Sequence, residues 1–269
     1  MFEPFLSRWN LTADGVPIVT HSSRLLPVRR GATPAMLKIA FEAEEKMGGV
    51  LMRYWDGDGA ARVLECEDDT LLLERATGQG SLIALVKDGR DDEASRVICN
   101  VAARLHAQRN KPLPDLIPLQ QWFAPLAEAA NKYGGILVRA KALATELLDA
   151  PREVVPLHGD LHHENVLDFG PRGWLAIDPK RLIGERTFDF ANILSNPDRA
   201  TATAAGRLAR QADIIASAAQ LDRHRLLQWV LAWFGLSAVW WLEDHAQDDK
   251  NAEPDLAVAE IAAAEIDKS

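Results

Sequence analysis

Short apolar runs that alternate with polar residues dominate the first 75 residues of the chain. Runs of period two that are separated by turn residues are typical of β-strands. The strands predicted in this way cover residues 9–12, 16–20, 25–29, 35–40, 61–66 and 70–75. One helix-favouring stretch interrupts them after residue 40, so this part of the chain is predicted to be a sheet with a single helix.

Beyond residue 80 the apolar positions recur every three to four residues, as they do on the buried face of a helix. The helices predicted from this period cover residues 92–108, 119–133, 137–148, 200–219, 222–244 and 254–266. Residues 76–80 contain two glycines and are flexible enough for a hinge. We therefore predict an α+β fold with two lobes: a β-rich lobe over residues 1–76, which binds a nucleotide, and a mainly helical lobe over residues 77–269.

Composition and charge narrow the function classes. With 48% hydrophobic and 26% charged residues, the chain has the composition of an ordinary globular protein. A net charge of −9 argues against a nucleic-acid partner and suits a small cationic substrate. The most apolar run, residues 229–242, is shorter than the roughly 20 residues that span a bilayer. We expect a cytoplasmic protein without a membrane partner, as a monomer or weak dimer.

The most informative stretch reads His-Gly-Asp-Leu-His-His-Glu-Asn-Val-Leu and begins at residue 158. Asn165 follows Asp160 by five residues, and Asp178 follows Asn165 by thirteen. Two strand-like runs around a Gly-Pro-Arg-Gly turn lie between Asn165 and Asp178, and such a hairpin brings both residues together. Phosphoryl transfer from a nucleotide needs a base for the attacking hydroxyl and oxygen ligands for magnesium. We predict a small-molecule kinase that uses ATP and Mg²⁺, with Asp160 as base and with Asn165 and Asp178 as metal ligands.

The same stretch admits two other interpretations. His158, His162 and His163 together with Asp160 could hold zinc in a metal-dependent hydrolase. Asp and Asn residues in turns also commonly do no more than cap backbone groups, which would make the loop purely structural. A lysine upstream favours the kinase, because a zinc hydrolase does not need one.

That lysine is Lys38, on the predicted strand at residues 35–40. In kinases a strand lysine contacts the nucleotide phosphates and is positioned by a glutamate on a helix. The acidic, helix-favouring stretch that follows supplies candidates for this partner, of which we prefer Glu45, with Glu44 next.

Two further nucleotide contacts are placed by their order in the chain. The glycine-rich loop G-x-G-x-x-G of protein kinases is absent, and Ser22 and Ser23 occupy its place. Serine hydroxyls and backbone N–H groups can still cradle phosphate oxygens. The backbone from Glu74 to Ala76, just before the hinge, is where an adenine would be bound.

Several segments together resemble the aminoglycoside phosphotransferase family. They are residues 20–23, 37–38, 54–57, 158–169, 173–179 and 184–193. Within the family the chain is most similar to the streptomycin 6-phosphotransferases, which are grouped as aminoglycoside/hydroxyurea antibiotic-resistance kinases. The resemblance implies a protein-kinase-like fold and ATP-dependent phosphorylation of the 6-hydroxyl of streptomycin, which gives resistance. It also implies the same roles for Lys38, Asp160, Asn165 and Asp178.

The acceptor site is less defined. Streptomycin carries guanidinium groups, which carboxylates bind bidentately. Glu185, Asp189, Glu243 and Asp244 are the candidates for this pairing, although Asp189 could instead bond the catalytic loop. Lys180 departs from the family pattern and has no assigned role. A kinase for another sugar or amino alcohol, or a catalytically silent nucleotide-binding module, would show the same loop.

Overall fold

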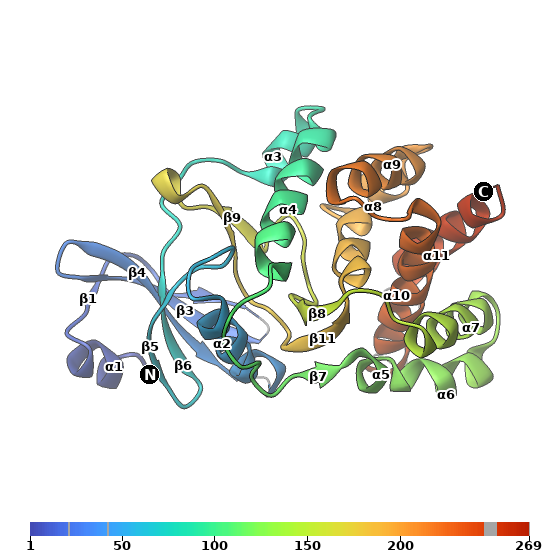
Figure 1. Ribbon diagram of the computed structural model, residues 1–269. Coiled ribbons are helices and arrows are strands. Elements are labelled where there is room, and N and C mark those ends of the chain that lie inside the picture. The colour runs from blue at the N-terminus through green and yellow to red at the C-terminus, as the bar shows by residue number, and fades with distance from the viewer. Residues whose placement is uncertain (21, 42, 245–251, 269) are drawn as a thin grey trace.

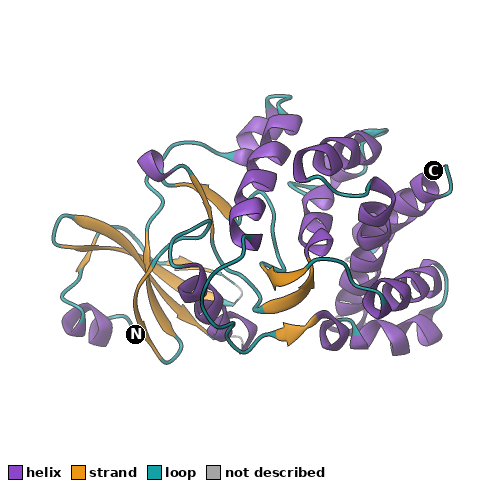
Figure 2. Ribbon diagram, in the orientation of Figure 1, coloured by secondary structure: helices purple, strands orange, loops and turns teal. Residues whose placement is uncertain are grey.

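The computed structural model describes residues 1–20, 22–41, 43–244 and 252–268, and the side chains of residues 43–48 and 244 lie outside the described part. A lobe built on a β-sheet lies beside a larger helical lobe, with a small second sheet and a hairpin between them (Figure 1). Figure 2 shows the strands gathered on the N-terminal side and the helices on the C-terminal side. The predicted α+β fold class is confirmed.

The N-terminal lobe is a six-stranded sheet with the order β1-β3-β4-β6-β5, and β2 pairs with β3 beside β1. All pairings in it are antiparallel. The strands are β1 (Thr12–Ala13), β2 (Ile18–Val19), β3 (Ser23–Arg30), β4 (Thr33–Ala40), β5 (Val63–Glu67) and β6 (Thr70–Glu74). The predicted helix after β4 is confirmed as α2 (Ala43–Trp55).

Alternation along β4 decides which way its side chains point. Leu37 is fully buried in a cluster that includes Phe5 of α1 (Glu3–Arg8), on one face of the sheet. Met36 points to the other face, into a cluster with Met52 of α2 and Leu175. Lys38 has the parity of Met36, so its side chain lies on the face that α2 and the hairpin cover.

The strand predicted for residues 9–12 is wrong. Helix α1 ends at Arg8, and strand pairing begins only at Thr12. Pro4 stands in the first helical turn, where its missing N–H costs nothing. The rings of Phe5 and Trp9 lie 5.2 Å apart, and both pack against the buried residues of the sheet. This packing stabilises a helix that is too short to form alone.

The C-terminal lobe is mainly helical and contains the largest core cluster. Its helices are α3 (Leu82–Lys87), α4 (Asp91–His106), α5 (Leu119–Trp122), α6 (Ala124–Tyr133), α7 (Ile136–Asp149), α8 (Arg199–Ala202), α9 (Arg207–Ala219), α10 (Arg223–Asp244) and α11 (Glu253–Ile266), with 3₁₀ segments η1 (Gly170–Arg172) and η2 (Arg186–Ser195). The predicted helices are confirmed, except that two of them are broken, at Phe123 and at residues 203–206.

Two small sheets flank the stretch that begins at His158. Strands β8 (Val154–Leu157) and β11 (Leu182–Glu185) pair antiparallel, with β7 (Ile117–Pro118) on the other side of β11. Strands β9 (Val166–Asp168) and β10 (Trp174–Ala176) form the predicted hairpin, which closes over η1.

Helix α10 is the centre of the C-terminal core. Trp229, Trp233 and Phe234 on it are buried, and Phe188 meets the two tryptophans edge-on. By length and composition alone this helix could cross a membrane, but 67% of its most apolar window is buried inside the molecule. A mostly buried core helix passes the same test of length and composition, so α10 is only weak evidence of a membrane span.

The predicted hinge is held in place by the hairpin. The N–H groups of Gly78 and Gly80 donate to the backbone oxygen and the carboxylate of Asp168, at 3.0 and 2.9 Å. A Cβ atom on Gly78 would lie 2.0 Å from Cγ of Asp168, so only glycine allows this approach. Gly78 and Gly80 thus allow a close contact with Asp168, whereas the sequence suggested a flexible hinge.

Candidate active site

The turn beneath Asp160 is fixed by a buried carboxylate. Asp189 of η2 accepts hydrogen bonds from the backbone N–H groups of His158 and Gly159, at 2.8 and 2.7 Å. Its Oδ2 also lies 2.8 Å from Nε2 of His106 on α4. Gly159 has φ +81°, and a Cβ there would lie 2.8 Å from a methyl carbon of Leu182. Backbone freedom at Gly159 and a clamp by Asp189 therefore define this turn.

His158 closes the turn from below. Its Nδ1 accepts the N–H of Asp160 at 3.2 Å, so its Nε2 carries the proton and donates to the backbone oxygen of Ile177 at 2.8 Å. Complete burial lowers the pKa of this imidazole, against the opposing effect of the Asp189 charge. A neutral His158 thus ties the catalytic turn to the end of β10.

The predicted base and the two predicted metal ligands form a trio that lies together, as the hairpin requires: Asp160, Asn165 and Asp178. Nδ2 of Asn165 donates to the backbone oxygen of Asp160 at 2.9 Å and reaches its Oδ2 at 3.3 Å. The N–H of Ile177 donates to the backbone oxygen of Asn165 at 2.9 Å, which places Asp178 next to Asn165. Asp178 itself has φ +59°, an uncommon conformation for a residue with a side chain. Such outliers cluster at functional sites.

Lys38 reaches this trio from the other lobe. Its Nζ lies 2.7 Å from Oδ1 of Asp178, and the lysine side chain is only 3% exposed. The sheet, the hairpin and the catalytic turn therefore contribute to one polar site. The candidate partner Glu45 lies in α2, and its side chain is outside the described residues.

The donor set at the hairpin suits a hard divalent cation. Because Nδ2 of Asn165 is used by Asp160, its Oδ1 is the atom left for a metal, beside the carboxylate of Asp178. Amide and carboxylate oxygens are the ligands that magnesium prefers. Asn165 and Asp178 would hold Mg²⁺, which would neutralise charge on the transferred phosphate.

The zinc interpretation is wrong. No group of three or more His, Cys, Asp or Glu side chains in the described part of the chain could hold a metal ion. His158 is bonded to Ile177 and Asp160. His163 is buried, and neither of its ring nitrogens has a hydrogen-bond partner among the described residues. Burial is the main cause that lowers the pKa of His163 to about 4.

Several of the groups predicted to contact the nucleotide in the N-terminal lobe already bond other groups of the protein. Ser23 is buried, and its hydroxyl lies 3.0 Å from that of Thr20. The backbone oxygen of Ser22 accepts the N–H of Phe41 at 2.8 Å. The carboxylate of Glu74 pairs with Arg172 of the hairpin. These contacts leave the loop at Ser22 beside the end of β4.

Of the two predicted adenine contacts, Glu74 and Ala76, one has its backbone N–H already used by the protein itself. The backbone N–H of Glu74 donates to the oxygen of Arg62 at 2.9 Å, so a base cannot use it. Ala76 follows Glu74 by two residues and is partly buried against the cluster that contains Met52. Ala76 is therefore the better placed of the two candidates.

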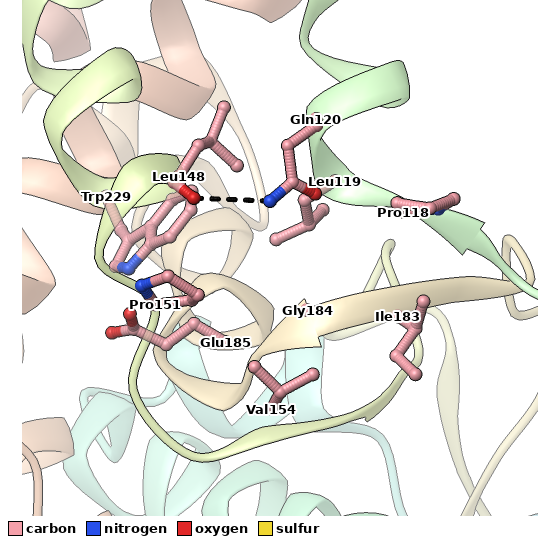
Figure 3. Close-up of a pocket in the computed structure, with 10 residues that line it drawn as sticks. All are labelled: Pro118, Leu119, Gln120, Leu148, Pro151, Val154, Ile183, Gly184, Glu185 and Trp229. Atoms are coloured by element: carbon pink, nitrogen blue, oxygen red, sulfur yellow. Dashed lines mark hydrogen bonds between the residues drawn. The ribbon is translucent and has the colours of Figure 1, made fainter.

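Glu185 does not face the catalytic turn. Val154 pairs with Glu185 and Leu157 with Leu182, which puts Glu185 at the far end of the β8–β11 pair from His158. Its carboxylate is 1% exposed and binds Arg225 through both oxygens, at 2.7 and 2.6 Å. It borders a small cavity of about 130 Å³ beside Trp229 (Figure 3). Ion pairing and distance along the strand thus remove Glu185 as an acceptor contact.

The other acidic candidates divide in the same way. Asp189 is buried and spends both oxygens on the catalytic turn, which is the structural alternative considered for it. Glu243 is exposed near the end of α10 and remains available to a ligand. The side chain of Asp244 lies outside the described residues.

Two residues near Asp160 had no predicted role. Lys180 lies 3.9 Å from Oδ2 of Asp160 through its Nζ. Asn192 of η2 donates to Oδ1 of Asp160 at 2.8 Å. The sequence offered one signal for Asn192, namely an amide inside the otherwise apolar run from residue 190 to 194. A partly buried amide needs partners, but the pattern does not say which.

The family follows from comparison with known sequences. The profile of the aminoglycoside/hydroxyurea antibiotic resistance kinases matches residues 8–245. The chain belongs to this family. It is a phosphotransferase with an alcohol group as acceptor, as predicted. Streptomycin 3''-kinase of Klebsiella pneumoniae is 52% identical over 96% of this chain and 98% of its own length. Streptomycin 6-kinase of Streptomyces griseus is 35% identical over 96% and 87%.

Solved structures agree on the fold. The apo form of a thermostable mutant of aminoglycoside phosphotransferase APH(4)-Ia aligns with a TM-score of 0.70 and 16% identity, over 98% of this chain and 99% of its own. A choline/ethanolamine kinase family protein from Mesorhizobium loti aligns with a TM-score of 0.67 and 16% identity, over 98% and 90%. At this level of identity the likeness shows the protein-kinase-like fold alone.

Proposed function

We propose that the protein is a streptomycin phosphotransferase that transfers the γ-phosphoryl group of ATP to the 3''-hydroxyl and so gives resistance to the antibiotic. The observation that carries the substrate is the 52% identity to the Klebsiella streptomycin 3''-kinase over nearly the full length of both chains. The streptomycin 6-kinase of Streptomyces griseus shares much less, 35%. The position expected from the resemblance, the 6-hydroxyl, therefore gives way to the 3''-hydroxyl.

The residues at the site support the reaction. Asp160 is the base that takes the proton of the acceptor hydroxyl as the new O–P bond forms, while the bond from the γ-phosphorus to the β–γ bridging oxygen breaks and ADP leaves. Asn165 and Asp178 present oxygens to Mg²⁺, and Lys38, 2.7 Å from Asp178, lies where it can also contact the phosphates. Relatives of this fold bind such nucleotides: APH(4)-Ia has been crystallised with ADP and with AMP-PNP.

The lobes and the compartment follow from the same proposal. The lobe of residues 1–76 would bind the nucleotide and the lobe of residues 77–269 the acceptor, so the two substrates meet at Asp160. ATP and magnesium are plentiful in the cytoplasm, where we place the enzyme. Streptomycin is cationic, and the net charge of −9 favours its approach.

A panel of acceptors tests this proposal. Purified protein is given ATP and Mg²⁺ with streptomycin, with hydroxyurea, or with an aminoglycoside that has no guanidinium group. We expect ATP consumption with streptomycin alone, and proton–phosphorus NMR of the product should place phosphate on the 3''-oxygen.

Hydroxyurea is included because a hydroxyurea phosphotransferase of Kitasatospora aureofaciens is 34% identical over 97% of this chain. Consumption of ATP with hydroxyurea but not with streptomycin would replace the proposed acceptor. Phosphate on the 6-oxygen would keep the acceptor and overturn its position.

A further inference from the structure

The carboxylate of Asp160 is contacted on both of its oxygens. Among the described residues, the shortest side-chain contact is from Nδ2 of Asn192 to Oδ1, at 2.8 Å. Asn165 reaches Oδ2 at 3.3 Å, Nε2 of His162 lies 3.7 Å from Oδ1, and Lys180 lies 3.9 Å from Oδ2. Asn192 is therefore the group that most directly sets the orientation of this carboxylate.

The amide of Asn192 has only one orientation that satisfies its neighbours. A carboxylate accepts hydrogen bonds only, and an indole N–H donates only. Nε1 of Trp233 lies 3.4 Å from Oδ1 of Asn192. A flipped amide would set oxygen against the carboxylate of Asp160 and NH₂ against the indole N–H. The hydroxyl of Ser195 and Nδ2 of Asn196 each lie 3.5 Å from the same Oδ1. Trp233, the nearest of the three donors, therefore helps to keep the NH₂ group of Asn192 facing Asp160.

Trp233 is itself packed in the core of the C-terminal lobe. It is 6% exposed, and its ring meets those of Phe188 and Trp240 edge-on, at 5.3 and 5.4 Å. Asn196 adds a hydrogen bond of 2.9 Å to the backbone oxygen of Asn192. The core of the C-terminal lobe therefore extends through Trp233 and Asn192 to the base.

We propose that Asn192 is a positioning residue for Asp160 and that Trp233 helps to fix the amide that does the positioning. The inference rests on the proposed function, in which Asp160 is the base. Rotation of an aspartate carboxylate about its last bond is soft, so a hydrogen bond from a fixed donor decides where its lone pairs point. A base must aim a lone pair at the acceptor hydroxyl, and small misplacements cost as much as 10²-fold in rate.

Three variants test the inference. Asn192→Ala removes the donor, Trp233→Phe keeps an aromatic ring but removes the indole N–H, and Asn192→Asp puts a second carboxylate beside Asp160. Asn131→Ala is the matched control, because Asn131 is exposed on α6. For each, kcat, the KM values for ATP and streptomycin, the pH–rate profile and the thermal unfolding curve are measured.

Loss of positioning should lower kcat of Asn192→Ala by roughly 10- to 100-fold, with the KM for ATP unchanged within about 2-fold. Trp233→Phe should show a smaller loss of kcat in the same direction. Asn192→Asp, which puts a repelling carboxylate against Asp160 in place of the donor, should lose kcat at least as strongly, with the KM for ATP again unchanged within about 2-fold. A role in folding alone would move none of these readouts in a variant that stays folded.

Turnover of Asn192→Ala within about 2-fold of the Asn131→Ala control would overturn the inference, and so would near-normal turnover of Asn192→Asp. Failure of the proposed function has a different signature, because then the unaltered protein phosphorylates none of the aminoglycosides. A crystal structure of folded Asn192→Ala needs no acceptor and decides the inference in that case. The carboxylate of Asp160 should be turned from its orientation in the unaltered protein, and an unchanged orientation would reject the positioning role.

Discussion

Nζ of Lys38 lies 2.7 Å from Oδ1 of Asp178, across 140 residues of sequence. One residue stands on the N-terminal sheet and the other at the exit of the β9–β10 hairpin, so this ion pair joins the lobes at the proposed metal site. Lys38 is 3% exposed and Asp178 is 28% exposed. The lysine is thus a buried cation, where a solitary strand lysine would usually lie at the surface.

Replacement of Lys38 by methionine should damage catalysis more than folding. The charge that contacts the phosphates is lost, and turnover should fall by about 10²-fold or more. Because Asp178 stays partly solvated, the loss of stability should be smaller than the roughly 3–5 kcal/mol of a fully buried broken pair. Steady-state kinetics and urea unfolding measure the two effects. Lys87→Met, at an exposed lysine, is the control; equal kinetic effects in both variants would speak against a role at the phosphates.

Asp160→Asn tests the base. The amide cannot take the proton of the hydroxyl, so kcat should drop by roughly 10²–10⁴-fold. Nucleotide affinity, measured by calorimetry, should hold because Lys38 and Asp178 are untouched. Near-normal turnover in this variant would exclude Asp160 as the base.

Asp189→Ala should destabilise the protein through the catalytic turn. The change leaves the N–H groups of His158 and Gly159 buried without their acceptor, at a cost of about 1–3 kcal/mol each. Chemical denaturation followed by tryptophan fluorescence measures the loss. Glu243→Ala, at an exposed carboxylate, should change the free energy of unfolding by less than about 0.5 kcal/mol. A similar small change for Asp189→Ala would contradict the clamp.

The low pKa of His163 makes the free energy of unfolding depend on pH. Its pKa is about 4 in the folded protein, because of burial and then the positive charge of Arg207, and about 6.5 when unfolded. The unfolded chain then binds the proton more tightly, so this contribution is complete above pH 6.5 and is lost as the pH falls toward 4. The loss amounts to about 3 kcal/mol at most. His163→Leu should flatten the fall in unfolding free energy between pH 6.5 and 4, and an unchanged slope would reject this account.

Local sequence sufficed for much of the site. The turn residues between Asn165 and Asp178 determine a hairpin, and the alternation around Lys38 determines its face, so both could be predicted. Contacts between distant segments could not. The pairing of Glu185 with Arg225 and the clamp by Asp189 depend on how β11 and η2 pack, which no short pattern records.

The other differences between the predicted and the observed structure also have physical causes. Helix α1 was missed because six residues give too little periodicity, and its stability comes from packing of Phe5 and Trp9 on the sheet. Gly78 and Gly80, before α3, suggested mobility when only the local sequence was considered. Their close approach to Asp168 is a tertiary contact, which a local pattern does not reveal. Asn192 could be recognised as an amide in an apolar run, but its contact with Asp160 required the fold.

The central claim is that Lys38, Asn165, Asp178 and Asp160 surround one nucleotide and one acceptor hydroxyl. A crystal structure with a non-hydrolysable ATP analogue, Mg²⁺ and streptomycin tests it most directly. The account predicts oxygens of Asn165 and Asp178 on the metal, Lys38 on the phosphates and the 3''-hydroxyl within hydrogen-bond distance of Asp160. A triphosphate bound elsewhere, with these four side chains turned away from it, would contradict the account.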